Sequence, residues 1–148
     1  MSVDKHAEAT MKKILAGVDG SAESRAAAHK AAELARALGA QLVIAYAVAP
    51  FPPLSPVNYV EGWDLAERKY ATALLRELEG TCRGEVEAVE TTTVVGTAAE
   101  ALAELARAPD VEMVVVGHRG RGAVQRMLLG SVADRLVQIS PKPVLVMR

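Results

Sequence analysis

The chain has few cysteine and aromatic residues, little net charge and no long apolar run, and each of these absences argues against a class of protein. Only one of its 148 residues, Cys82, is a cysteine, so no disulfide can form within the chain. Aromatic residues make up 3% and the net charge is −1, which argues against base stacking and against a basic surface for nucleic acid or membranes. No apolar run approaches the roughly 20 residues of a membrane-spanning helix, and residues 1–10 lack the apolar core of a signal peptide. We therefore expect a cytoplasmic protein with no nucleic-acid or membrane partner.

The remaining composition is that of a globular domain. Hydrophobic residues account for 51% and charged residues for 24%, and 148 residues are enough for one domain with a sizeable core. We expect residues 1–11 to form a flexible N-terminal tail and residues 12–148 to form a single folded domain.

Apolar segments of strand length alternate with amphipathic segments of helix length. Strands are predicted at 12–18, 41–48, 85–95, 111–116 and 144–147, and helices at 22–38, 61–79, 98–108 and 130–139. Ser21 and Gly39 should cap and stop the first helix, Thr97 and Glu100 have capping-box spacing, and Tyr70 is assigned to the inner face of the second helix. This alternation predicts a parallel sheet with helices on both faces and a ligand site beyond the carboxyl ends of the strands.

Glycines follow the fourth predicted strand in the pattern Gly117-x2-Gly120-x9-Gly130-Ser131. A strand that leads through glycines to a helix start can gather backbone N–H groups around phosphate, here those of Gly130, Ser131 and Val132. The pattern lacks the Lys-Ser or Lys-Thr of a P-loop, and its spacing and position differ from the Rossmann fingerprint. On spacing alone two interpretations stay open. The segment is either an anion site or a set of tight turns before a helix that Ser131 caps.

With its surroundings, this pattern resembles the nucleotide-binding signature of the universal stress protein family. The similarity extends from Lys12 to Arg148, through the stretches Lys13–Leu15, Asp19–Ser21, Val114–Gly117, Leu129–Ala133 and Pro141–Val146. The resemblance implies an α/β fold: a single-domain, Rossmann-like, five-stranded parallel sheet with helices on both faces and strand order 3-2-1-4-5, of the adenine nucleotide alpha-hydrolase type. It also implies that ATP is bound, with Mg²⁺ arriving on the triphosphate rather than in a cage of protein ligands.

The resemblance assigns parts of the nucleotide to positions in this sequence. The nucleotide-binding positions that it implies are Gly17, Asp19, Ala47, Val116, Gly117, Gly120, Gly130, Ser131 and Val132. Asp19 would lie beside the nucleoside, and the main chain near Ala47 would meet the adenine. Three arginines in or beside the glycine segment are either phosphate contacts or solvated loop residues: Arg119, Arg121 and Arg126. His118 has no neighbour in sequence that makes it an acid–base group, so no catalytic residue and no metal ligand is assigned.

Three functions remain open at the level of the sequence. The first is a regulatory nucleotide-binding module of the stress response, and the second is a slow ATPase or adenylate-transferring enzyme that uses the same site. The third is a nucleotide-independent interaction protein. The last strand, Val144–Met147, is short, apolar and expected at a sheet edge, and the resemblance implies a homodimer formed through it.

Overall fold

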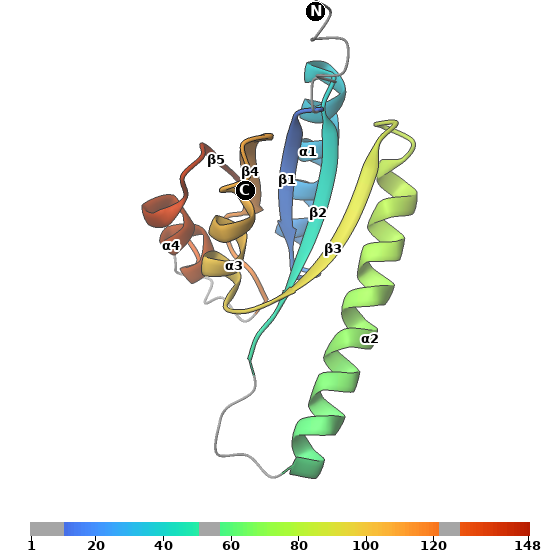
Figure 1. Cartoon of the computed structure of the whole chain (residues 1–148), viewed down its shortest axis with the longest axis vertical. Helices are drawn as coiled ribbons and strands as arrows, with labels where there is room; N and C mark the ends of the chain where they lie inside the picture. Colours follow the sequence, from blue (N-terminus) through green and yellow to red (C-terminus); the bar gives the residue numbers. More distant parts are fainter. Residues whose placement is uncertain (1–10, 51–56, 122–127) are drawn as a thin grey trace, which may run out of the picture.

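Five parallel strands form the centre of the molecule in the computed structural model, which describes residues 11–50, 57–121 and 128–148. The strands are β1 (Lys13–Val18), β2 (Gln41–Val48), β3 (Val89–Val95), β4 (Val111–Gly117) and β5 (Val144–Met147). Their order across the sheet is β3-β2-β1-β4-β5, as predicted (Figure 1). The order reverses direction between β1 and β4, which is where open α/β sheets hold ligands.

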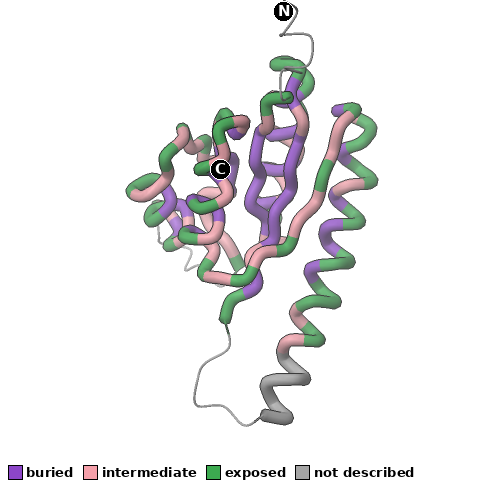
Figure 2. The backbone as a smooth tube through the Cα atoms, viewed as in Figure 1, coloured by how far each residue is buried: buried purple, intermediate pink, exposed green. Residues whose placement is uncertain are grey.

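Two helices cover each face of the sheet. They are α1 (Ala22–Leu38), α2 (Val57–Cys82), α3 (Ala98–Leu105) and α4 (Ser131–Ile139). Side chains of β1 alternate between two cores: Ile14 and Ala16 pack with α1 and α2, whereas Leu15 packs with α3 and α4. The central strands are therefore buried on both sides (Figure 2), which explains their nearly continuous apolar sequence.

The predicted limits of α1 are confirmed. Ser21 has extended backbone and its Oγ accepts a hydrogen bond from the Ser24 N–H at 3.1 Å. Gly39 adopts a left-handed conformation with φ of 64° and donates its N–H back to Ala35 and Arg36 carbonyls. This firm start of α1 matters for the site, because the turn before it carries Asp19.

Boundaries of three predicted elements were wrong. Helix α3 ends at Leu105 rather than at residue 108, because the N–H groups of Arg107 and Ala108 donate to carbonyls three residues back and form a turn. Strand β3 begins at Val89 rather than Glu85, because the N–H groups of Glu85 and Val86 both donate to the Cys82 carbonyl and close a turn after α2. Helix α2 is longer than predicted at both ends, and at its C-terminal end Gly80 is accommodated within it.

Two predicted side-chain placements were also wrong. Thr97 makes no capping bond to the backbone; its hydroxyl donates to Glu100, which also accepts from Arg135 and so ties α3 to α4. Tyr70 is 37% exposed rather than internal, because its ring lies edge to face against Tyr46 and below the Arg121 guanidinium.

The predicted tail, residues 1–11, lies almost entirely outside the described residues and stays a prediction. Within the described ranges, no helix combines the length and the apolar character needed to cross a membrane. The cytoplasmic location is likewise still a prediction.

Candidate functional site

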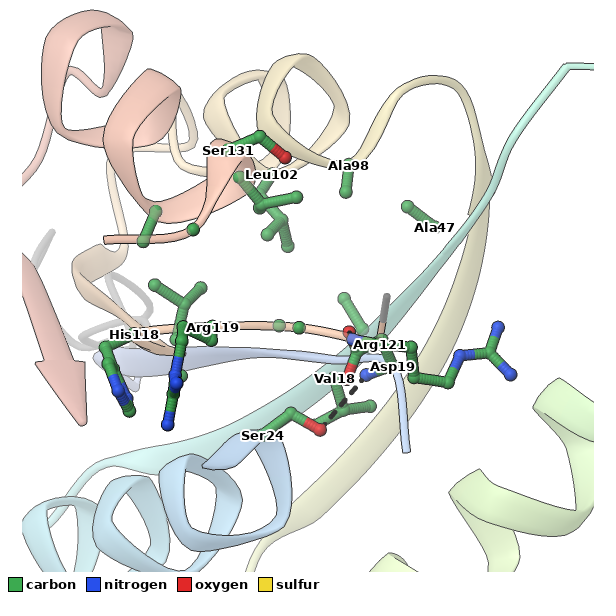
Figure 3. Close-up of a pocket in the computed structure, with 18 residues that line it drawn as sticks. Val18, Asp19, Ser24, Ala47, Ala98, Leu102, His118, Arg119, Arg121 and Ser131 are labelled. Atoms are coloured by element: carbon green, nitrogen blue, oxygen red, sulfur yellow. Dashed lines mark hydrogen bonds between the residues drawn. The ribbon is translucent and has the colours of Figure 1, made fainter. Parts of the chain in front are cut away.

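A pocket of about 200 Å³ opens at the carboxyl ends of β1, β2 and β4, on the face that α3 and α4 cover (Figure 3). Its lining includes the sequence-predicted residues Gly17, Asp19, Ala47, Val116, Gly117, Arg119, Gly120, Arg121, Gly130, Ser131 and Val132. Arg126 lies outside the described residues. The fold thus brings together segments from both halves of the chain, while their contacts with a ligand stay predictions.

The floor of the pocket is apolar and nearly free of side chains. Gly17 of β1 is paired in register with Ala45 of β2, and Ala47 follows on the same face. A Cβ on Gly17 would lie 2.5 Å from Leu102 Cδ1, so glycine allows α3 to approach the sheet closely. Small residues below and Leu102 above leave a flat apolar space, which suits an aromatic ring.

The opposite end of the pocket is the start of α4. Gly130 is the N-cap, and Ser131 and Val132 open the first turn, where N–H groups have no acceptor within the helix. These donors and the positive end of the helix dipole favour an anion. The interpretation of Ser131 as the cap is wrong, because it is the first helical residue.

Gly130 has a structural task that the sequence did not reveal. Its N–H, expected to donate to phosphate, is instead donated to the His118 carbonyl at 2.5 Å. A Cβ at this position would lie 3.0 Å from both Arg119 Cα and the His118 carbonyl oxygen. Glycine therefore fits the tight contact between the two ends of the glycine segment, and the N–H groups without an acceptor within the helix begin at Ser131.

Asp19 joins the turn after β1 to the segment after β4. Its Oδ1 accepts the Ser21 N–H at 2.9 Å, and its Oδ2 accepts the Arg121 N–H at 2.8 Å. A Cβ on Gly120 would lie 2.4 Å from Oδ2, so the close approach needs glycine. Asp19 therefore meets the glycine segment at the wall of the pocket. Burial raises the pKa of Asp19, but the hydrogen bonds from Ser21, Arg121 and Ser24 outweigh it and lower the pKa, so the carboxylate stays ionised and is a weak base.

Ser24 belongs to the site and was missed at the level of the sequence. It is 4% exposed, and its Oγ accepts the N–H groups of Asp19 and Gly20 at 3.2 Å while donating to the Ser21 carbonyl. The hydroxyl thus replaces water for the turn that carries Asp19. A serine three residues after the N-cap, on the buried face of α1, was the available signal.

The basic side chains of the glycine segment point away from the start of α4 (Figure 3). Arg119 Nη2 lies 3.5 Å from Glu23 Oε1 of α1, and Arg121 reaches toward α2. His118 Nδ1 lies 3.1 Å from the Met147 carbonyl oxygen, to which it donates. In this arrangement the start of α4 presents main-chain N–H groups to the pocket, and the described side chains of His118, Arg119 and Arg121 lie away from them.

A resident metal site is not apparent in the part of the chain that the structure describes, where no three His, Cys, Asp or Glu residues gather. Asp19 is the one carboxylate among the described lining residues.

The sheet order and a pocket at its switch point define a doubly wound α/β protein with a crevice at the carboxyl ends of its strands. The chain belongs to the universal stress protein family, whose model matches residues 10–148. A universal stress protein from Thermus aquaticus is 34% identical over 145 residues, which cover 93% of this chain and 98% of that protein.

Solved structures agree with this assignment. UspA from Lactobacillus plantarum superposes with a TM-score of 0.85 at 25% identity, covering 93% of this chain and 98% of its own. A universal stress protein crystallised in complex with cAMP has a TM-score of 0.72 at 29% identity. The match covers 93% of this chain and 97% of that one.

Proposed function

We propose that this universal stress protein binds ATP in the pocket and serves as a regulatory nucleotide-binding module. The observation that carries the proposal is the combination, in one pocket, of an apolar floor with the first-turn N–H groups of α4, which have no acceptor within the helix. Adenine would lie on Ala45 and Ala47, the ribose beside Val116 and Gly117, and the phosphates at Ser131. The relative that holds cAMP, an adenine nucleotide, supports the same class of ligand.

Magnesium would arrive with the triphosphate. Both Asp19 oxygens already accept main-chain N–H groups, so the carboxylate would assist a cation through a remaining lone pair or through water. The same bonds make Asp19 a poor general base, and His118 is directed to β5. Binding, rather than hydrolysis or adenylate transfer, is the function that this lining supports.

A larger side chain on the floor of the pocket should abolish most of the ATP binding. Ala47→Leu would add three carbons to the space assigned to adenine, and we expect ATP affinity to fall at least about tenfold. The measurement is calorimetric titration of ATP with Mg²⁺. Ala73→Leu, on the exposed face of α2, is the matched control and should bind as the parent does. If the Ala47 variant binds ATP with the same affinity as the parent, adenine does not lie on the floor of the pocket. If the parent does not bind ATP, the proposed function is refuted.

We also propose that β5 pairs with a second copy. It is an edge strand of apolar residues, and the carbonyls of Pro143 and Met147 face β4, so the backbone of Val144 and Val146 faces outward. Sedimentation at micromolar concentration should give a dimer. Val146→Pro removes an outward N–H while the bonds to β4 remain, and it should give a monomer. A monomeric parent would contradict the proposal.

A further inference from the structure

Arg121 connects the wall of the pocket with α2. Its main-chain N–H holds Asp19, while its guanidinium passes over the strand ends toward α2 (Figure 3). There Nη2 donates to Tyr46 Oη at 3.1 Å and lies 3.8 Å from Glu67 Oε1, and Cζ lies 4.6 Å from the centre of the Tyr70 ring. A hydroxyl, a carboxylate and a ring face therefore meet one guanidinium.

The side chains that contact Arg121 also contact one another. Tyr46 is 1% exposed, and its hydroxyl donates to Glu67 Oε1 at 2.5 Å. The rings of Tyr46 and Tyr70 meet edge to face, with centres 6.1 Å apart. The Tyr70 hydroxyl also reaches the Asp19 carbonyl, at 3.5 Å. Glu67 balances the charge of Arg121, so the cluster does not require a phosphate for neutrality.

We propose that Arg121 is a positioning residue rather than a phosphate ligand. With three further side chains it forms a clamp, consisting of Arg121, Tyr46, Glu67 and Tyr70. The clamp fastens the main chain of residues 119–121 to α2 and so holds Asp19 and the pocket wall in the shape that a ligand meets. It also couples α2 to the pocket, because a shift of Tyr70 or Glu67 releases the contact of Arg121 with Asp19.

The clamp is testable without a ligand, by amide hydrogen exchange over residues 119–121 of the full chain. Tyr70→Leu removes the ring face under the guanidinium and should speed exchange there about two- to fivefold. Tyr70→Phe keeps the ring and should remain close to the parent. Asp64→Asn is the charge control on the same helix, since Asp64 pairs only with Arg68 of α2 among the bonds described, and should change nothing. Unaltered exchange in the leucine variant would overturn the proposal.

Nucleotide affinity provides a second readout, which rests on the proposed function. A clamp that shapes the pocket predicts that Tyr70→Leu weakens ATP and AMP by the same factor, again about two- to fivefold. A direct phosphate contact predicts instead that Arg121→Met lowers the affinity for ATP far more than the affinity for AMP, and that Tyr70→Leu lowers neither. This result would refute the clamp. If the parent binds no nucleotide, the proposed function fails, and the exchange experiment still decides the clamp.

Discussion

Gly117→Ala is expected to destabilise the protein by about 1–3 kcal/mol and to weaken nucleotide binding at least about tenfold. Gly117 ends β4, and a Cβ there would lie 2.8 Å from the backbone carbonyl carbon and the Cβ of Glu23, and 2.9 Å from the Ser24 nitrogen. These atoms belong to the first turn of α1 and cannot rotate away as a side-chain end can. Either β4 or the start of α1 must move.

The movement would reach the site directly. Ser24 holds the turn of Asp19, so a shift of the first turn of α1 disturbs the pocket wall as well as the packing. Urea unfolding at one fixed protein concentration measures the stability, and titration with ATP measures the binding.

Gly80→Ala is the control for the Gly117 variant. Beyond the adjacent backbone of α2 itself, no atom lies within 4 Å of a Cβ at Gly80, so alanine should stabilise the protein by about 0.5–1 kcal/mol. If the two Gly→Ala substitutions change the unfolding free energy with opposite signs, the effect of steric collision is separated from the effect of backbone entropy. A Gly117 variant as stable as the parent would contradict the close packing of β4 on α1.

Leu136→Ala is expected to cost about 2–5 kcal/mol of unfolding free energy. Leu136 is 0% exposed and packs in the core between the sheet and the helix pair α3 and α4. Helix α4 has nine residues, and its two buried residues are Ala133 and Leu136. Truncation of the larger one leaves a cavity and loosens the helix whose first turn supplies the anion donors.

The matched control for Leu136 is its neighbour. Val137 is 54% exposed, so Val137→Ala should change the unfolding free energy by no more than about 0.5 kcal/mol. Thermal unfolding of both variants at equal concentration is the measurement, with roughly 2–4 °C expected for each kcal/mol. Equal melting temperatures for the two variants would show that α4 is not anchored through Leu136.

Much of the fold could be predicted because its signals are local. The strands at 41–48 and 144–147 were located without error, and Ser21 and Gly39 marked the limits of α1. Errors arose where distant partners decide the outcome. Thr97 and Glu100 have capping-box spacing, yet Glu100 accepts from Arg135 of α4 instead.

The candidate site, like the fold, could be predicted only in part. The glycines and Asp19 could be located from the sequence, because the carboxyl ends of parallel strands meet at one edge of the sheet. The direction of each polar side chain could not. Arg121 bonds to Tyr46, 75 residues away in the sequence, and such a partner leaves no trace in local spacing.

The sequence by itself determined the order of the strands and helices, the family, and the segments that line the pocket, since these follow from periodicity and from residues close together in the chain. The tertiary structure alone decided that Gly130 donates to His118, that Ser24 supports the turn of Asp19, and that Arg121 is held by α2. Each of these is a hydrogen bond or ion pair whose partner is chosen by packing. Short-range geometry decides such contacts, and only the folded chain brings their atoms within reach.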